Sequence, residues 1–329
     1  MKTLNQPLSE QEMLVAPTIE QMQEVFETIA ASTYRGVQGV LKIDSSSTDG
    51  GPTIGITTCT HGNEIAGLAP FVPYLKADRL AQLLRHGSVI VSVNNLEAAR
   101  RFFAAKSEQE RHQLRSLDCN MNRLPEDVLQ RSGDTRYEIQ RVLELASVFG
   151  EFDAALDIHS TIIPSKPMIV EIKGGLPLLA GAPIDTVLTN MVSVQRGIPV
   201  SALYGGNRQN VPVIGIEAGH QGQDRTLVDS TRIFQAFLQN INAIPGSPTM
   251  STPKRDLYHL ANSIFFPNAS YRFVRAFRTF ESIQCGETLA AGDGAPVLSP
   301  VDGHILFPKL KEFDFREDEA AFISNPVTS

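Results

Sequence analysis

The chain of 329 residues is 42% hydrophobic and 20% charged, which is typical of a globular protein with one large domain or two ordinary ones. Its 36 acidic and 29 basic residues give a net charge of −7, which argues against nucleic acid or an anionic membrane as a partner. The three cysteines lie far apart and the N-terminus lacks the apolar core of a signal peptide, so we expect a cytoplasmic protein without a disulfide framework.

The N-terminal part predicts a helix and then two strands. Residues 18–21 have the form of a helix capping box, and apolar residues follow at helical spacing up to Ile29. A short strand is expected at residues 40–43, and the apolar run 53–57 is typical of a buried strand. Residues 1 to about 32 are expected to form an N-terminal extension of the first domain.

The loop after residues 53–57 carries the first candidate metal ligands. His61 and Glu64 are three positions apart on a turn that Gly62 opens, so both side chains can bend round one divalent ion. A histidine and a glutamate on a solvated loop would give the same pattern. The pair therefore needs further ligands elsewhere in the chain.

Strands and helices alternate in the next part of the chain. A helix interrupted by two prolines is expected within residues 65–75, and clearer helices at 134–149 and 227–244. The predicted strands are 88–94, 153–158, 168–172, 198–203 and 211–216. This alternation predicts an α/β fold with a mostly parallel mixed sheet that is covered by helices on both faces.

Two further candidates follow the ends of predicted strands. His159 comes directly after strand 153–158, and Glu217 after strand 211–216. Because ligands bind where the carboxyl ends of parallel strands converge, His159 can join His61 and Glu64 in a zinc site that keeps one position open for water. Zinc would lower the pKa of that water, and Glu217 is the candidate base. A hydrogen-bonded core histidine and a buried partner of an arginine are the alternatives for His159 and Glu217.

Several polar side chains lie on segments without helical or strand periodicity. Asn122 and Arg123 end the segment 118–123 and offer donors that suit a carboxylate, and Arg115 lies just upstream. Later, Tyr204 and Arg208 flank a glycine-rich loop. Arginines directed into one site of an acidic protein suggest a small anionic substrate.

The character of the sequence changes after a linker-like segment at residues 245–249. Short strand candidates and glycine turns replace the helical pattern. We therefore expect two domains, a catalytic domain at residues 1–248 and a small β-barrel-like domain at residues 249–329.

Four short motifs resemble the succinylglutamate desuccinylase/aspartoacylase family, whose fold is similar to that of the zinc carboxypeptidases. His61-Gly62-Asn63-Glu64 resembles its zinc-binding H-G-N-E, and residues 157–161 its D-L-H-x-T segment. Residues 120–123 are similar to its D/N-x-N-R loop, and residues 217–219 to its E-x-G segment. Together the motifs cover most of residues 53–222, in the same order.

The resemblance implies a zinc hydrolase that cleaves the amide bond of a small N-acyl amino acid, and we expect a succinylglutamate-like substrate. One Zn²⁺ would be held by His61, Glu64 and His159. Glu217 would act as general base and then as general acid.

The same resemblance implies roles for the polar loops. Arg115 would polarise the scissile carbonyl, Asn122 and Arg123 would hold a substrate carboxylate, and Tyr204 and Arg208 another. The implied partner is a small anionic N-acyl amino acid. Self-association into a homo-oligomer stays open.

The C-terminal part carries a weaker resemblance. Residues 298–305 are similar to the β-barrel-like appendage of the family, and residues 319–322 to an E-A-A-Y segment near the substrate of aspartoacylases. Phe322 takes the place of the tyrosine and lacks its hydroxyl group. Glu319 and Phe322 can therefore line the site or simply belong to a tail that packs on the barrel.

Two other functions fit parts of the pattern. A carboxypeptidase-like metallopeptidase would use the same metal chemistry, but a C-terminal domain that narrows access disfavours long peptides. A non-catalytic binding protein on the same fold would have no use for a base at position 217. We expect an N-acyl amino acid deacylase ahead of both.

Overall fold

The computed structural model describes residues 6–47, 50–208, 210–247, 253–309 and 318–325. Its α-helices in these ranges are α1 (Glu10–Met13), α2 (Ile19–Ala31), α3 (Phe71–Leu75), α4 (Arg79–Leu83), α5 (Leu96–Ala104), α6 (Glu108–Gln113), α7 (Tyr137–Phe149), α8 (Met191–Val194) and α9 (Asp224–Asn240). Its strands are β1 (Thr33–Tyr34), β2 (Val37–Gln38), β3 (Val40–Asp44), β4 (Thr53–Thr58), β5 (Ser88–Val93), β6 (Ala154–Thr161), β7 (Met168–Lys173), β8 (Thr186–Thr189), β9 (Val213–His220), β10 (Asp256–Ile264), β11 (Arg272–Phe273), β12 (Glu281–Ile283), β13 (Thr288–Ala291), β14 (Val297–Leu298), β15 (Gly303–Leu306) and β16 (Ala321–Ser324).

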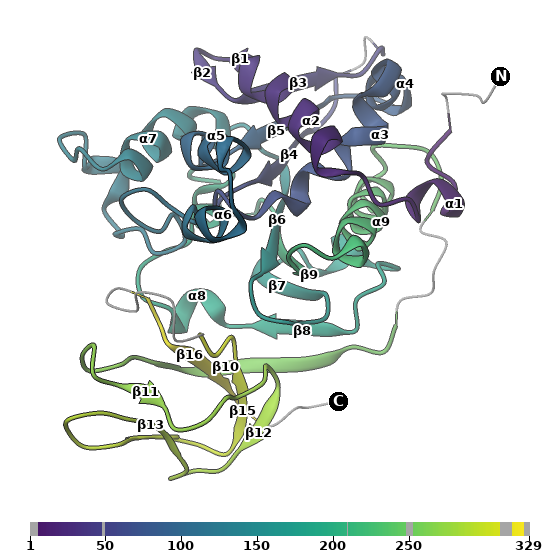
Figure 1. Ribbon diagram of the computed structural model, residues 1–329. Coiled ribbons are helices and arrows are strands. Elements are labelled where there is room, and N and C mark those ends of the chain that lie inside the picture. The colour runs from purple at the N-terminus through teal and green to yellow at the C-terminus, as the bar shows by residue number, and fades with distance from the viewer. Residues whose placement is uncertain (1–5, 48–49, 209, 248–252, 310–317, 326–329) are drawn as a thin grey trace.

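One large sheet organises the molecule (Figure 1). Its strand order is β12-β15-β16-β10-β8-β7-β9-β6-β4-β5-β3. In the part from β5 to β8 the pairs β4–β5, β4–β6, β6–β9 and β7–β8 are parallel, whereas β7–β9 is antiparallel. The predicted α/β fold with a mostly parallel mixed sheet is confirmed.

Helices cover both faces of this sheet, because its central strands are apolar on both sides. Ile56, Leu156 and Ile216 belong to the core beneath α2, α3 and α9. Ala155, which directly precedes Leu156, and Val213, three positions before Ile216, belong to the core beneath α7. Figure 1 accordingly shows α7 and α9 on opposite sides of β4 and β6.

The N-terminal extension packs on this same domain. Leu8 and Met13 are buried, and the Gln235 side chain on α9 bonds both the N–H (2.8 Å) and the C=O (3.1 Å) of Leu8. Arg79 donates to the carbonyl of Gln6 (2.8 Å). After it comes α2, whose predicted capping box is present at Thr18.

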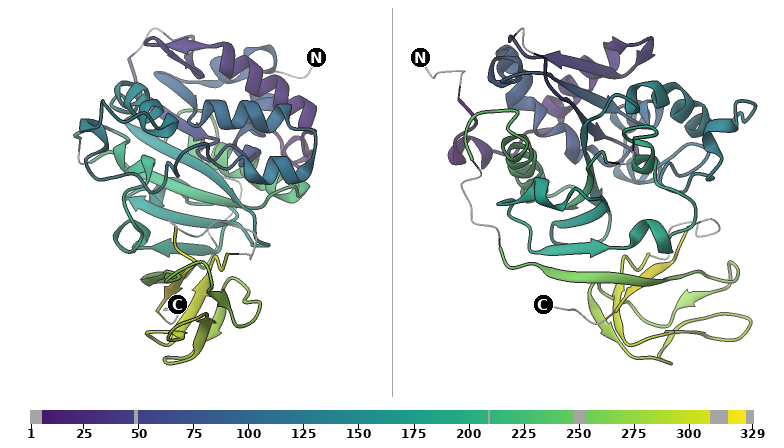
Figure 2. Two further views of the ribbon diagram at one scale, coloured as in Figure 1. Left: turned by 60° about the vertical axis from the view of Figure 1, so that its left-hand side comes forward. Right: turned by 180° about the vertical axis from the view of Figure 1, so that it is seen from behind.

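The C-terminal strands form a small lobe (Figure 2). Strands β10, β16, β15 and β12 pair antiparallel, and a second sheet of β11, β13 and β14 encloses a small core with them, as expected for a barrel-like unit. β10 pairs in parallel with β8, so one sheet runs through both parts of the chain. The proposed boundary at residues 248 and 249 lies outside the described residues, and the two-domain division stays a proposal.

Several predicted elements differ in the structure. The strand expected at residues 198–203 is a 3₁₀ helix, Val200–Leu203, because Pro199 has no N–H to extend the short backbone pairing between Ile198 and Leu124. His159 and Glu217 lie within β6 and β9 rather than beyond their ends.

Among the described residues, we find no helix with the length and apolar character needed to span a membrane.

Candidate metal centre and substrate pocket

A tight turn after β4 shapes the loop with the first two candidate ligands. Cys59 adopts a left-handed backbone with φ 50°, which turns the chain sharply away from the strand. The N–H of Gly62 then donates to the carbonyl of Arg115 (2.9 Å). A Cβ on Gly62 would lie 2.5 Å from the Cβ of Ala98, so only glycine lets the two segments pack this closely. The loop is thereby fixed beside Arg115.

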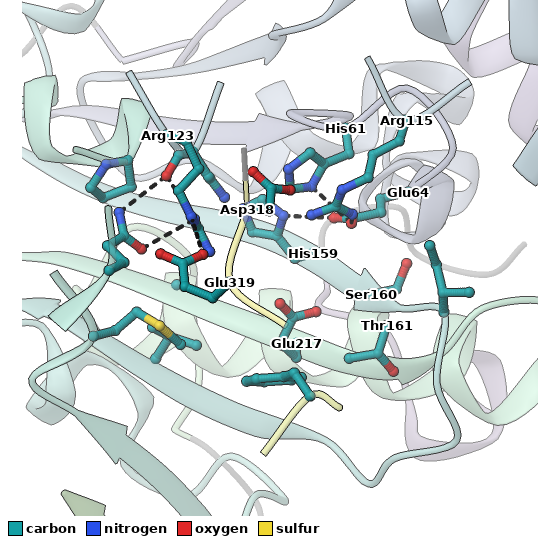
Figure 3. Close-up of a pocket in the computed structure, with 18 of the residues that line it drawn as sticks. His61, Glu64, Arg115, Arg123, His159, Ser160, Thr161, Glu217, Asp318 and Glu319 are labelled. Carbon is teal, nitrogen blue, oxygen red and sulfur yellow. Dashed lines mark hydrogen bonds and ion pairs between the residues drawn. The ribbon is translucent and has the colours of Figure 1, made fainter. Parts of the chain in front are cut away.

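His61, Glu64 and His159 converge as the sequence predicts (Figure 3). One ligand atom from each residue lies within 4.8 Å of the others, and all three residues are buried. The two carboxylate oxygens of Glu64 lie 2.8 Å from Nδ1 of His61 and 2.7 Å from Nδ1 of His159. Both imidazoles therefore present the same ring nitrogen to one point.

The second nitrogen of each imidazole is held by an oxygen. Nε2 of His61 lies 2.9 Å from Oδ1 of Asn120, and Nε2 of His159 lies 3.0 Å from Oδ2 of Asp157. Amide and carboxylate oxygens only accept hydrogen bonds, so both Nε2 atoms donate. This arrangement orients the rings and leaves their Nδ1 atoms for a metal, as in metal sites whose outer partners fix the histidine ligands.

Tyr204 belongs to a buried network behind Asp157. The hydroxyl of Thr57 donates to Asp157 (2.7 Å), and the hydroxyl of Tyr204 donates to Thr57 (3.0 Å). The side-chain amide of Asn94 donates to Tyr204 in turn (2.9 Å). Tyr204 is fully buried and is not among the described pocket-lining residues. Its hydroxyl thus supports the orientation of a candidate ligand from behind.

Glu217 lies next to His159 because the two residues are register partners in β9 and β6. Its Oε2 atom is buried without a hydrogen-bond partner among the described residues. Burial, followed by repulsion from Glu64, raises the pKa of Glu217 to about 8. Such a carboxyl group can hold or release a proton near neutral pH.

Neighbouring charges shift the pKa values of all three candidate ligands. Burial alone would favour a neutral Glu64, but the charges of His61, Arg115 and His159 hold its pKa well below the usual range. Burial likewise opposes a charged His159, but Asp157 and Glu64 raise the pKa of its imidazole well above the usual value. Burial lowers the pKa of His61, with Arg115 adding to the effect. Arg115 donates to Glu64 at 2.6 Å.

A buried carboxylate anchors the loop that follows Arg115. Glu138, at the start of α7, accepts hydrogen bonds from three consecutive backbone N–H groups and from the side chain of Asn95 (3.1 Å). The backbone donors are Leu117 (2.6 Å), Asp118 (3.0 Å) and Cys119 (3.0 Å). Glu138 was not among the predicted site residues, although a glutamate in the first turn of the clearest predicted helix was a visible signal.

The C-terminal segment contributes acidic groups to the pocket. Glu319 pairs with Nε of Arg123 at 2.6 Å and also accepts from the backbone N–H of Arg196 at 2.6 Å. Asp318 pairs with Lys309 (3.2 Å) and accepts from the Asn120 side chain (3.0 Å). Asn120 therefore bridges Asp318 to His61. None of Asp318, Lys309 and Asn120 was among the predicted site residues. No local pattern marks Asp318 or Lys309, whereas Asn120 begins the motif at residues 120–123.

Together these segments enclose a cavity of about 380 Å³. The predicted residues that line it are His61, Glu64, Arg115, Asn122, Arg123, His159 and Glu217. Glu319 and Phe322 also line the cavity, which settles the choice between a place in the site and a place in a tail packed on the barrel. The volume suits a ligand of a few tens of heavy atoms or fewer.

Like Tyr204, the predicted residue Arg208 is not among the described residues that line the pocket. Its guanidinium pairs with Asp153 and donates to the carbonyl of Gly150 (3.0 Å). It ties its own loop to the start of β6. The expected second carboxylate site at Tyr204 and Arg208 is therefore absent from the described part of the pocket.

Comparison with known proteins places the chain in a family. Residues 50–243, more than half of the chain, match the model of the succinylglutamate desuccinylase/aspartoacylase catalytic domain. Among curated proteins, no sequence matches significantly.

Solved structures share the fold at low sequence identity. Succinylglutamate desuccinylase from Vibrio parahaemolyticus is 17% identical with a TM-score of 0.66, covering 87% of this chain and 85% of that one. The enzyme from Vibrio cholerae is also 17% identical with a TM-score of 0.66, covering 99% and 96%. Murine aminoacylase 3 is 20% identical with a TM-score of 0.55, covering 86% and 99%. With its zinc carboxypeptidase-like fold and its matching catalytic domain, the chain belongs to the succinylglutamate desuccinylase/aspartoacylase family.

Proposed function

We propose that this protein is a zinc-dependent hydrolase that cleaves the amide bond of a small N-acyl amino acid. The observation that carries the proposal is the convergence of His61, Glu64 and His159 beside Glu217 in one cavity. The deacylase family of the catalytic domain supports the same reaction class.

The donor set fits a zinc ion. Nδ1 of His61 is buried 2.8 Å from Glu64 but makes no hydrogen bond with any described residue, and a shared cation would explain this close approach. Two imidazoles and one carboxylate are a known catalytic zinc set that leaves a position open. A zinc ion held there would supply the Lewis acidity that makes water a nucleophile near neutral pH.

Glu217 would carry the proton transfers. As water attacks the amide carbonyl, the carboxylate accepts one proton from it. The same proton then passes to the nitrogen as the C–N bond breaks, so that one water yields a carboxylic acid and an amine. The pKa of Glu217, which burial raises to about 8, suits a group that must both take up and release a proton.

Two other residues would hold the substrate. Arg115 lies at the candidate metal group, and its partly exposed guanidinium can donate to the carbonyl oxygen as charge develops on it. Asn122 lines the same cavity, and its buried Oδ1 has no hydrogen-bond partner among the residues described, so it is free to accept from a substrate N–H.

The test is a hydrolysis screen over N-acetyl, N-succinyl and N-formyl amino acids with zinc present, using the wild type and Glu217→Gln. We expect the variant to bind zinc as the wild type does, while kcat falls by about a hundredfold to ten-thousandfold. Glu171→Gln on the neighbouring strand β7, which is not among the described pocket residues, is the matched control. Normal turnover by Glu217→Gln, or a wild type that binds no divalent metal, would refute the proposal.

Short peptides added to the same screen decide the peptidase alternative. Lys309, Asp318 and Phe322 line the cavity from the C-terminal side, which leaves little room for a chain of several residues. We therefore expect no release of C-terminal residues from peptides.

A further inference from the structure

Arg123 is enclosed by groups of the protein itself. Its Nε pairs with Glu319 at 2.6 Å, and its Nη1 donates to the carbonyl of Asn122 (2.7 Å) and to the side chain of Gln195 (3.3 Å). The ring of Phe322 lies against the guanidinium, 5.8 Å from centroid to Cζ. The arginine that the sequence assigns to a substrate carboxylate thus already has a carboxylate partner.

Glu319 is held firmly in this position. Its side chain is 0% exposed, and its other oxygen accepts from the N–H of Arg196 at 2.6 Å. A substrate carboxylate that docked on Arg123 would lie beside this buried anion. Two carboxylates at one arginine repel each other, and burial of one of them shields that repulsion from solvent.

A second pair repeats the arrangement at the same side of the cavity. Lys309 pairs with Asp318, so another cation is matched by an acid of the C-terminal segment. Among the described lysines and arginines that line the cavity, only Arg115 is paired with a candidate metal ligand, Glu64, instead of an acid of that segment. A metal ion on Glu64 would neutralise that partner, and the remaining N–H groups of Arg115 then serve both the scissile carbonyl and one carboxylate.

Apolar side chains form much of the remaining wall. They come from the segment after β6, from β7, from α8 and from the C-terminal part, and are Ile162, Ile163, Val170, Met191, Phe307 and Phe322. Such a wall gains from burying an alkyl or aromatic group, at roughly 25 cal/mol per Å² of apolar surface.

We propose that the preferred substrate is an N-acyl amino acid with a single carboxylate and an apolar side chain, and that Glu319 selects against a second carboxylate. This inference rests on the proposed deacylase function and narrows its substrate class. It replaces the succinylglutamate-like substrate expected from the motifs. Arg123 is neutralised within the protein, and Tyr204 and Arg208 are not among the described pocket residues, so no described cation is left for an extra carboxylate.

Binding separates this inference from the reaction itself. Zinc-loaded Glu217→Gln protein, in which turnover is suppressed, is titrated in a calorimeter with N-acetyl-L-phenylalanine and N-acetyl-L-aspartate. We expect the phenylalanine compound to bind at least about tenfold more tightly, a difference of about 1.4 kcal/mol. Equal or tighter binding of the aspartate compound, or binding of neither, would overturn the inference. This comparison needs no change at position 319.

Glu319→Gln tests the selecting residue. Glutamine keeps the shape and the acceptor for the N–H of Arg196 but removes the charge. The affinity for N-acetyl-L-aspartate should rise about tenfold, while that for N-acetyl-L-phenylalanine changes less than about threefold. The matched control is Asp229→Asn, which removes a buried arginine-paired carboxylate on α9 outside the described pocket lining. An unchanged affinity ratio in Glu319→Gln would refute the role of Glu319.

Turnover by the wild type distinguishes the two proposals. If the phenylalanine compound binds but neither compound is hydrolysed by zinc-loaded protein, the deacylase function fails and the ligand class stands. If only N-acetyl-L-aspartate and N-succinyl-L-glutamate are hydrolysed, the function stands and the inference fails.

Discussion

The two sides of the pocket are built in different ways (Figure 3). On the metal side, His159 and Glu217 sit on neighbouring parallel strands, and a hydrogen-bonded network fixes the ring nitrogens. On the C-terminal side, Asp318 and Glu319 enter from a distant segment and neutralise two cations. We therefore expect that the side with the candidate metal ligands, the metal side, carries out the proposed reaction and that the C-terminal side selects the substrate, so each should change without the other.

Loss of a ligand should break the metal side most severely. In His159→Ala, zinc affinity should fall by at least about a hundredfold, because the change removes a ligand itself rather than an outer partner. Chelator competition measures the affinity, and thermal unfolding shows whether zinc still raises the Tm. The exposed His259 on β10 provides the control variant His259→Ala. Unchanged zinc binding in His159→Ala would remove the basis for the site.

Zinc binding should depend strongly on pH. Asp157 and Glu64 outweigh the effect of burial and raise the pKa of His159, which must lose its proton to bind a metal. In the metal-free protein, the stability from this group is complete below about pH 6.5 and is lost as the pH rises through the raised pKa. Zinc affinity should therefore increase about tenfold per pH unit for each proton released.

Calorimetry in two buffers of different ionisation enthalpy counts the released protons, and the zinc-induced rise in Tm should be larger at higher pH within this range. A zinc affinity that is constant from about pH 6 to pH 8 would contradict a protonated His159.

Removal of the Tyr204 hydroxyl should sharpen the comparison. Tyr204→Phe breaks the network two hydrogen bonds behind Asp157, so zinc affinity should weaken about threefold to tenfold, less than for a direct outer partner. The ratio of affinities for one-carboxylate and two-carboxylate ligands should stay the same. Tyr74→Phe, which removes a buried tyrosine hydroxyl bonded to Gln235, is the control. A changed ratio of these affinities together with a normal zinc affinity would instead indicate that Tyr204 contacts the substrate.

The smallest effect is expected at Phe322. Phe322→Tyr restores the hydroxyl of the family's E-A-A-Y segment but leaves Glu319 charged. If charge rather than this hydroxyl sets selectivity, the ligand ratio should change less than about threefold. If the buried hydroxyl finds no hydrogen-bond partner, the free energy of unfolding measured in denaturant should fall by about 1–3 kcal/mol. A large gain in affinity for N-acetyl-L-aspartate would assign selection to the hydroxyl instead.

Much of the metal side could be predicted from sequence. His61 and Glu64 lie on one short loop, and His159 and Glu217 follow apolar runs whose strand character is evident, so sheet geometry brings them together. The 3₁₀ helix before Tyr204 was not predicted. This helix leads into a tyrosine that lies behind the candidate metal ligands rather than in the cavity.

The C-terminal side could not be predicted in the same way. The pair between Arg123 and Glu319 joins residues far apart in the chain, and nothing near either one indicates a partner. The alternation of strands and helices predicted the central sheet. The pairing of β10 with β8 is a contact across the proposed boundary, and local periodicity contains no information about it.

The β8–β10 pairing has a consequence for the integrity of the whole chain. Four residues of β10 from Asp256 to His259 bond in parallel to β8, which without them would be the last strand on that side. A shortened protein that ended near residue 248 would expose a row of unpaired peptide groups and the apolar side chains beside them. Exposed edges of this kind recruit other chains and lead to aggregation. The strand β10 thus covers the edge of β8, and we expect a fragment that lacks β10 to aggregate.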